Sequence, residues 1–385
     1  MAILVLNHFL VKNFYLHSFL LVLIASAVFS FSKNIEHKTL EIGAAAPDFS
    51  LQGVDGKTYS LSSFKNAEIL VVIFTCNHCP TAQAYEERIM KLTTDYAGKN
   101  VQVVCIMPND PASLRLDELD FSDLGDSFDE MKIRAAERKF NFPYLYDGSS
   151  QKVSLAYGPV ATPHAFIFDR ERRLRYQGRI DDTENPFKSP RTTDTRNAIN
   201  ALLQHKAVPV PTTKVFGCSI KWSEKKESVE KALIAWSKEP VNLTMIDNPT
   251  LKNLLTNSSK KLYLINFWST SSTVSMDEFS SFITINRMYR NRDFEFISIC
   301  ADEMANKDSA FQFLTHQQAS NTNYFLDVKA NPDWTNLLNP SWKGTLPYTF
   351  IVEPGGKIVY SRLGAINDAE LKSTIVSNPM IGRYP

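Results

Sequence analysis

The chain lacks a charge excess and has few cysteines. Its 385 residues carry 42 lysines and arginines against 41 aspartates and glutamates, which leaves a net charge of +1. Nothing in this balance indicates binding to nucleic acid or to an anionic membrane surface. Only five cysteines occur, with a single Cys-x-x-Cys pair, so no second pair supplies the two further ligands of a structural zinc site. The length is enough for about two domains.

Charged residues are also nearly absent from the first 32 positions, where Lys12 is the one lysine or arginine. An apolar run, 19–24, leads into small residues at 25–27. This resembles a secretory signal, although the apolar stretch is also long enough for an uncleaved membrane anchor. No cysteine lies near its end, which argues against a bacterial lipoprotein. In either case we expect an exported chain in the periplasm or on the extracytoplasmic side of a membrane, where disulfide chemistry is permitted.

The most informative feature present is Cys76-Asn77-His78-Cys79, which follows the apolar run 69–74. The pattern predicts two thiols where a buried strand gives way to a helix. A helix N-terminus carries about half a positive charge and free N–H groups, so it favours a thiolate. The spacing therefore indicates dithiol–disulfide chemistry.

The other three cysteines are not close to this pair in sequence. Cys105 and Cys300 lie inside apolar strand-like runs and are interpreted as small buried hydrophobic residues. Cys218 lies in a connector beside aromatic residues, where a structural role and a redox role both remain open.

The chain contains a diverged internal repeat. Each copy has an apolar strand, a helix, a second apolar strand, a short third strand and two closing strands that follow a proline. The segments are 69–74, 82–96, 101–107, 144–147 and 161–178 in the first copy, and 262–268, 276–289, 294–300, 324–327 and 345–364 in the second. Apolar strands alternating with helices predict an α/β fold with a sheet covered on both faces. The turn 354–356 predicts a closing antiparallel hairpin and therefore a mixed sheet.

This repeat gives the expected domain organisation. A signal peptide or anchor (1–32) is followed by a first domain (38–205), a linker (206–222) and a second domain (223–379). The linker is expected to be extended because it contains Pro209-Val210-Pro211. The second domain is expected to begin with an amphipathic helix over 223–238.

A strand, a Cys-x-x-Cys at a helix start and a distant Thr162-Pro163 opening another strand resemble the thioredoxin superfamily. The segment 42–51 and the Cys76–Pro80 motif are similar to the redoxin branch (AhpC/TSA-type, peroxiredoxin-like) over about residues 40–205. The second copy is a weaker match, over about 240–375, to extracytoplasmic thiol–disulfide reductases. The resemblance implies two tandem thioredoxin-like folds, each with a mixed central sheet flanked by helices.

The resemblance also implies roles for the residues of the first copy. Cys76 would attack a client disulfide and Cys79 would resolve the mixed disulfide. A protonated His78 would favour the thiolate, although a solvated histidine of little effect is an equal alternative. The family places a cis-proline at Thr162-Pro163, beside the cysteines, where the preceding backbone pairs with a client. Related sequences often have a further cysteine before this pair, where this chain has Ala161.

The second copy departs from the redox pattern. Where an active domain has W-x-x-x-C-x-x-C, this chain has Trp268 followed by serines, so Ser272 and Ser275 occupy the cysteine positions. A serine cannot form a disulfide, which makes this copy redox-inactive. The proline at Pro347 remains, so the domain either binds extended peptide or is purely structural.

Two further patterns bear on function. The peroxidase motif P-x-x-x-[T/S]-x-x-C fits neither Cys76 nor Cys79, so peroxidase activity is not expected from the known site. Residues 110–130 are rich in aspartate and glutamate, which is typical of a solvated insertion. A docking surface for a basic partner is the alternative.

We therefore expect an extracytoplasmic thiol–disulfide oxidoreductase that uses Cys76 and Cys79, without cofactor or metal. Its partners would be protein or small thiol and disulfide clients and one further redox partner, with a membrane tether if the N-terminal segment is an anchor. The alternatives are a non-enzymatic binding protein, which would capture metal through the cysteines with His78 and His164, and an atypical thiol peroxidase. The residues do not indicate whether the enzyme oxidises or reduces its clients.

Overall fold

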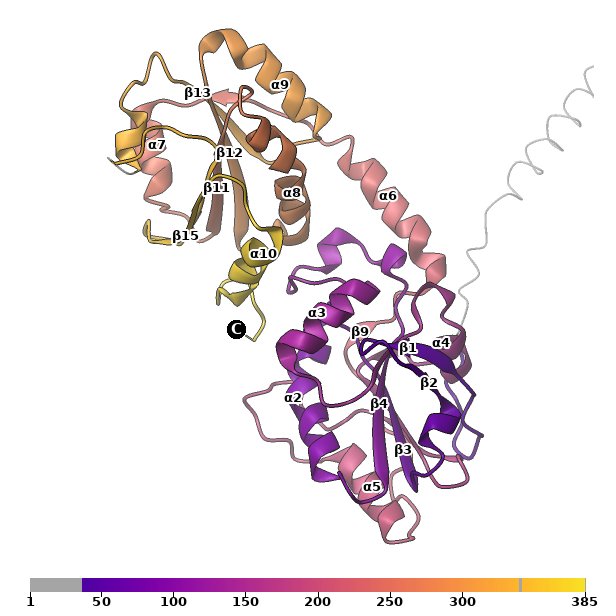
Figure 1. Ribbon diagram of the computed structural model, residues 1–385. Helices are drawn as coiled ribbons and strands as arrows, with labels where there is room; N and C mark the ends of the chain where they lie inside the picture. Colours follow the sequence, from indigo (N-terminus) through magenta and orange to yellow (C-terminus); the bar gives the residue numbers. More distant parts are fainter. Residues whose placement is uncertain (1–36, 339–340, 385) are drawn as a thin grey trace, which may run out of the picture. The chain divides into compact units, whose positions relative to one another are not determined.

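The computed structural model describes residues 37–338 and 341–384, so the predicted signal or anchor segment, 1–32, lies outside the described residues. The described chain forms two mixed sheets, each flanked by helices (Figure 1). Within these ranges, no helix is both long enough and apolar enough to cross a membrane. The predicted α/β class and the two thioredoxin-like folds are confirmed.

The first sheet has seven strands. In spatial order they are β2 (Thr58–Ser60), β1 (Ser50–Gly53), β5 (Tyr144–Tyr146), β4 (Val101–Met107), β3 (Ile69–Phe74), β7 (His164–Phe168) and β8 (Leu174–Gly178). Strands β3, β4 and β5 are parallel, whereas β7 is antiparallel to both β3 and β8. The helices that accompany it are α2 (Pro80–Asp95), α3 (Phe128–Arg138), α4 (Lys152–Tyr157) and α5 (Asp194–Leu203).

The central strand β3 is buried on both faces, as its apolar sequence predicts. Because successive side chains point to opposite faces, Ile69, Val71 and Ile73 join a core with α2, α3 and α5. Leu70, Val72 and Phe74 join the core on the other face, which includes α4. Helices α2 and α4 accordingly lie on opposite sides of this sheet (Figure 1).

The second sheet repeats the plan with six strands. In spatial order they are β10 (Thr244–Met245), β13 (Thr322–Asp327), β12 (Phe294–Asp302), β11 (Leu262–Trp268), β14 (Tyr348–Val352) and β15 (Ile358–Leu363). The hairpin predicted from the Pro-Gly-Gly turn is the antiparallel pair β14–β15. The helices of this half are α6 (Lys226–Trp236), α7 (Asn248–Leu255), α8 (Thr273–Tyr289), α9 (Lys307–His316) and α10 (Asp368–Ser377).

Seven short 3₁₀ helices complete the described secondary structure: η1 (Leu61–Phe64), η2 (Pro111–Ser113), η3 (Leu116–Glu118), η4 (Gly148–Ser150), η5 (Ser223–Lys225), η6 (Met304–Asn306) and η7 (Trp334–Leu337). Most connect longer elements, as is usual for short 3₁₀ turns.

The strand register aligns the two copies residue by residue. In the first copy, Phe74 of β3 pairs with His164, which follows Pro163. In the second, Phe267 of β11 pairs with Tyr348, which follows Pro347. Both prolines follow cis peptide bonds. The end of β3 is therefore equivalent to the end of β11.

The segment 206–222, predicted to be a linker, contains the short strand β9 (Cys218–Ser219) and packs along the first sheet. The N–H of Gln177 in β8 donates to the carbonyl of Pro211 at 3.0 Å, and the N–H of Thr213 returns a bond of 3.2 Å to the carbonyl of Gln177. Further along, β9 (Cys218–Ser219) forms a two-stranded sheet with β6 (Ala161–Thr162). This part of the chain is consequently held against the first domain.

Candidate active site

The two cysteines of the motif lie between the end of β3 and the start of α2. Cys79 is the N-cap residue of α2, and Pro80 occupies the first turn, where its missing N–H costs no hydrogen bond. The Cys79 sulfur accepts a hydrogen bond from the N–H of Ala82 at 3.5 Å. Cys76 lies one turn earlier in the chain, and both cysteines are buried. The helix N-terminus thus faces Cys79 and stabilises a thiolate there.

The distant Thr162 contacts both thiols. Its hydroxyl lies 3.1 Å from the Cys76 sulfur, and its carbonyl accepts a hydrogen bond from Cys79 at 3.5 Å. Thr162 ends β6, and the cis bond to Pro163 follows it. The structure therefore brings together the two halves of the pattern, which are more than 80 residues apart in sequence.

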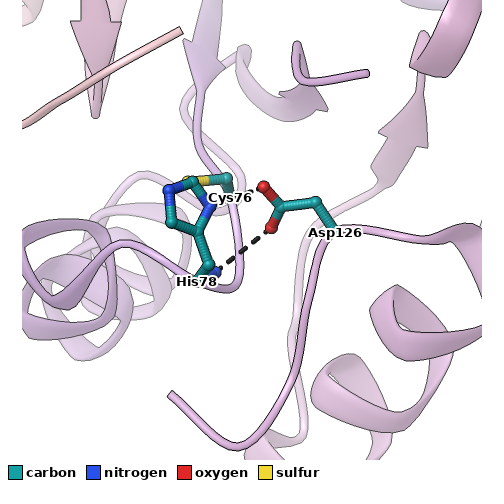
Figure 2. Close-up of side chains that lie close together, drawn as sticks. All are labelled: Cys76, His78 and Asp126. Carbon is teal, nitrogen blue, oxygen red and sulfur yellow. Dashed lines mark hydrogen bonds and ion pairs between the residues drawn. The ribbon is translucent and has the colours of Figure 1, made fainter. Parts of the chain in front are cut away.

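His78 does not face solvent: it forms a buried pair with Asp126. Its Nδ1 lies 2.6 Å from a carboxylate oxygen of Asp126, and both side chains are at most 2% exposed (Figure 2). The same carboxylate accepts the backbone N–H groups of Asn77 at 3.0 Å and His78 at 3.1 Å. It also accepts the side-chain amide of Asn109 at 2.7 Å. Asp126 thereby holds the turn between the two cysteines.

The two members of this pair shift one another's pKa. Burial by itself would lower the pKa of His78, but the charge of Asp126 and its hydrogen bond outweigh burial and raise it. Burial would raise the pKa of Asp126, but the charge and hydrogen bond of His78 lower it. Both shifts favour an imidazolium–carboxylate pair, which places a positive charge next to Cys79.

Asp126 was not identified from the sequence. It belongs to the acidic stretch 110–130, which was interpreted as a solvated insertion, and that interpretation is wrong for Asp126 and Asp110, each about 1% exposed. Acidic composition does not distinguish a solvated carboxylate from one that satisfies buried N–H groups. The sequence offers only a weak signal for Asp126: it directly precedes Ser127, the N-cap residue of α3, so its backbone position is set by the start of that helix.

The two thiols have opposite pKa shifts. Burial is the largest influence on each and raises both. For Cys79, hydrogen bonds with Cys218 and Cys76 outweigh burial, and the charge of His78 adds to them, so its pKa lies well below the ordinary value. For Cys76, the hydrogen bond with Cys79 and the charge of Asp126 act in the same direction as burial, and its pKa lies well above the ordinary value.

These contacts give the two cysteines different environments. The resemblance implies that Cys76 attacks and that Cys79 resolves. In the structure, Cys79 is the N-cap residue of α2 and its pKa is lowered, whereas the pKa of Cys76 is raised. The helix start lies at the second cysteine of the motif, which favours Cys79 over Cys76 as the position of a thiolate.

Cys218 is a third thiol at this site. It lies in β9, where it pairs with Thr162 of β6, and it is partly buried against the core that contains Cys76 and Cys79. Its largest electrostatic influence is a hydrogen bond with Cys79, which together with burial raises its pKa. The remaining cysteines, Cys105 and Cys300, are fully buried in β4 and β12, and burial raises the pKa of both.

The possible metal ligands at this site differ from the set expected from the sequence, which was the two cysteines with His78 and His164. Cys76, His78 and Asp126 each offer one ligand atom, and these atoms lie within 4.8 Å of one another. His164 is not among them, because its Nε2 lies 2.8 Å from the Gln177 side chain and its Nδ1 accepts a backbone N–H. Burial lowers the pKa of His164 to about 4, so its ring is neutral.

The corresponding site of the second copy has hydroxyl groups in place of thiols. Ser272 is the N-cap residue of α8, accepts the N–H of Ser275 at 3.3 Å and donates to the carbonyl of Leu346 at 3.4 Å. These are the contacts that Cys79 makes with Ala82 and Thr162 in the first copy.

Ser272 is consequently the equivalent of Cys79, and Ser269 is the equivalent of Cys76. Ser275 stands three residues into α8, where the first copy has Ala82. The predicted degenerate pair, Ser272 and Ser275, is therefore shifted by three residues relative to the first copy. Pro347 follows Leu346 in the position of Pro163.

The chain was compared with protein-family models, curated proteins and solved structures. Residues 41–196 match the family model described as Redoxin. A hypothetical protein from Sinorhizobium meliloti 1021 is 34% identical over 48% of this chain and 96% of its own, with a TM-score of 0.43. An uncharacterised conserved protein from Geobacillus kaustophilus is 37% identical over 49% of this chain and 95% of its own, with a TM-score of 0.43. The thioredoxin domain of a thiol-disulfide oxidoreductase from Bacteroides vulgatus is 19% identical over 35% and 86%, with a TM-score of 0.29. No curated protein matches the chain.

Proposed function

Because the chain belongs to the redoxin family of the thioredoxin superfamily through residues 41–196, we propose that it is a thiol–disulfide oxidoreductase that exchanges disulfides through Cys79 and Cys76. One observation carries the proposal. Two thiols meet at Thr162: Cys79, the N-cap residue of α2, and Cys76, and the pKa of Cys79 is lowered whereas that of Cys76 is raised. An attacking thiolate next to a resolving thiol is the arrangement that dithiol–disulfide exchange requires.

In the reducing direction, the Cys79 thiolate attacks one sulfur of a client disulfide. A mixed disulfide forms and the other client sulfur leaves as a thiolate. Cys76 then loses its proton and attacks the Cys79 sulfur, which releases the second client thiolate and leaves a Cys76–Cys79 disulfide. The hydroxyl of Thr162, 3.1 Å from the Cys76 sulfur, supports the developing thiolate. The oxidising direction is the reverse of these steps.

The experiment that tests the proposal follows the fate of oxidised glutathione mixed with the reduced protein. We expect Cys79→Ser to abolish the exchange, because the attacking thiolate is gone. We expect Cys76→Ser to slow the release of the second glutathione thiol from Cys79, because the resolving thiol is gone, and the transient adduct on Cys79 is detectable by mass spectrometry. Cys105→Ser is the matched control, because Cys105 is fully buried within β4, and it should exchange like the unmodified protein. Full exchange by Cys79→Ser would contradict the proposal.

We assign this exchange to the periplasm or the extracytoplasmic side of a membrane. The support is the apolar N-terminal sequence, 1–32, with its small residues at 25–27. Disulfide exchange is suited to such a compartment, where thiols are not kept reduced. Fractionation of cells that produce the full chain tests the assignment: recovery in the cytosolic fraction alone would contradict it.

Metal capture is a second candidate function, favoured by the three donor atoms of Cys76, His78 and Asp126. The donors suit a borderline metal such as Zn²⁺ or Cu²⁺. Against it, the four hydrogen bonds to the Asp126 carboxylate, one of them from Nδ1 of His78, would have to be given up. Equilibrium dialysis of the reduced protein against Zn²⁺ distinguishes the two: stoichiometric binding lost in His78→Ala would favour metal capture.

For the second copy we propose ligand binding without redox chemistry. Its degenerate site opens into a hollow of about 630 Å³, lined by Ser269, Ser272, Asp302 and Leu346 among others. Asp302 accepts the Ser269 hydroxyl at 2.5 Å and the N–H of Thr270 at 2.9 Å, in the manner of Asp126 in the first copy. Extended peptides that compete for client binding by the full chain, but not by a Pro347→Ala variant, would support a client-binding role.

A further inference from the structure

The strand β9 lies along the edge of β6, next to the cis-proline Pro163. Cys218 and Ser219 pair antiparallel with Thr162 and Ala161, the two residues that precede Pro163. An extended segment that adds to an exposed strand edge through main-chain bonds is a common mode of peptide recognition. The chain thus provides, from its own connector, a strand at the edge where an extended client would pair with Thr162.

The approach of this segment depends on Gly217. Its φ is +140°, a conformation that side chains rarely adopt, and a Cβ at this position would lie 2.0 Å from the carbonyl oxygen of Thr162. Only glycine therefore lets the segment come so close to β6. The preceding Phe216 packs against the Tyr85 ring of α2, with ring centroids 6.2 Å apart.

The consequence for the active site is a covered nucleophile. Cys79 has no exposed surface, and Cys218 is one of the partly buried groups packed against the core that contains it. Cys218 pairs in register with Thr162, whose carbonyl oxygen lies 3.5 Å from the Cys79 sulfur. Paired residues of neighbouring strands have their side chains on the same face, which places Cys218 on the face where Thr162 contacts Cys76.

From this geometry, and resting on the function proposed above, we propose that the segment 216–219 is an internal client and that Cys218 is a third redox thiol, which forms a disulfide with Cys79 in place of an external client. The segment leaves the edge of β6 when an external disulfide enters, and it returns while one external sulfur is still bonded to Cys79, so that Cys218 displaces that sulfur.

The chemistry balances without an added reactant. The Cys79 thiolate attacks an external disulfide, and one external thiolate leaves. Cys218 loses its proton and attacks the Cys79 sulfur, so that the bond between Cys79 and the external sulfur breaks and the Cys79–Cys218 bond forms. The second external thiolate leaves and takes up a proton. The external disulfide is reduced to two thiols while Cys79 and Cys218 are oxidised.

The test uses the full chain and oxidised glutathione, with Cys76→Ser in every sample so that the resolving role of Cys76 is absent. In Cys76→Ser we expect two glutathione thiols to be released per chain and a Cys79–Cys218 disulfide to appear in the peptide map. In Cys76→Ser with Cys218→Ser we expect one released thiol and a stable glutathione adduct on Cys79. The matched control is Cys76→Ser with Cys300→Ser, which should behave like Cys76→Ser because Cys300 lies buried in the second sheet.

Two outcomes would overturn the inference, and they differ. If Cys79 carries the same lasting adduct with and without Cys218, Cys218 is not a redox thiol, although the proposed exchange at Cys79 survives. If Cys79 takes up no glutathione in any sample, the proposed function fails and this inference fails with it. A second variant, Gly217→Ala, tests the cover directly: we expect it to raise the alkylation rate of Cys79 in the reduced protein about tenfold or more, because the strained segment detaches. An unchanged rate would contradict the covering role.

Discussion

Replacing Asp126 with asparagine tests whether the buried His78–Asp126 pair holds the active-site turn. The carboxylate accepts four hydrogen bonds inside the protein, from the N–H groups of Asn77 and His78, from Nδ1 of His78 and from the amide of Asn109. Asparagine keeps the shape and one acceptor oxygen, but it presents an NH₂ group to two of these donors and removes the charge.

The expected loss follows from these contacts. Removing one member of a buried ion pair costs about 3–5 kcal/mol, and His78 limits the cost by releasing its proton. We therefore expect Asp126→Asn to lower the free energy of unfolding by about 3 kcal/mol, against a total of about 5–15 kcal/mol for a typical domain. The variant should still fold, and with a smaller stability margin.

The pH dependence has a defined sign. The raised pKa of His78 contributes stability below its unfolded value of 6.5, and this contribution is lost as pH rises through the folded value. The lowered pKa of Asp126 contributes stability above its unfolded value of 3.8, and this contribution is lost as pH falls through the folded value. The difference in the free energy of unfolding between the unmodified protein and Asp126→Asn should thus be largest between the two unfolded pKa values and should shrink at lower and at higher pH.

Urea unfolding of both proteins across this pH range provides the measurement. Asp129→Asn is the control, because that carboxylate is 87% exposed and its loss should change stability by no more than about 0.5 kcal/mol. If Asp126→Asn unfolds like the control between about pH 4 and about pH 6, the range bounded by the reference pKa values of aspartate and histidine, the pair does not hold the turn.

Three other predictions follow from the site and the core. Iodoacetamide should modify Cys79 before Cys76, because the pKa of Cys79 is lowered and that of Cys76 is raised. The rate at Cys79 should stay constant through neutral pH and fall as the pH drops through the lowered pKa. A slower reaction at Cys79 than at Cys76 would refute the assignment of Cys79 as the attacking thiolate. Thr162→Val should slow release of a mixed disulfide by about 2–10-fold, because one hydrogen bond of about 0.5–1.5 kcal/mol to Cys76 is lost. An unchanged rate in stopped-flow exchange would count against a role of the Thr162 hydroxyl in release. Leu70→Ala, at a fully buried position of β3, should lower the free energy of unfolding in urea by about 2–5 kcal/mol. Leu155→Ala is the control, because Leu155 is 49% exposed and its loss should lower that free energy much less. Equal losses would contradict the described core.

Features with a periodic or local signal could be predicted from the sequence. The apolar run 69–74 is the central strand of a sheet covered on both faces, and the residues that follow it open α2. The repeat predicted the second sheet, and its Pro-Gly-Gly turn predicted the antiparallel pair β14–β15. These features can be predicted from the sequence because burial and strand alternation produce patterns among neighbouring residues.

Features that depend on distant contacts could not be predicted. The lowered pKa of Cys79 depends on the residue at which α2 begins and on the neighbouring thiols of Cys218 and Cys76. The role of Asp126 depends on buried N–H groups of the turn 77–78, some 48 residues earlier. Composition and spacing carry no information on either.

The measurement that tests the central claim most directly is a redox titration of the full chain in glutathione buffers, with free thiols counted and disulfides mapped at each poise. The account predicts that one disulfide containing Cys79 forms and breaks reversibly, with a midpoint between thioredoxin's, about −270 mV, and that of a strong oxidant, about −120 mV. A midpoint near the first value would make the protein a reductant, and one near the second an oxidant. Five free thiols at every poise would contradict the account.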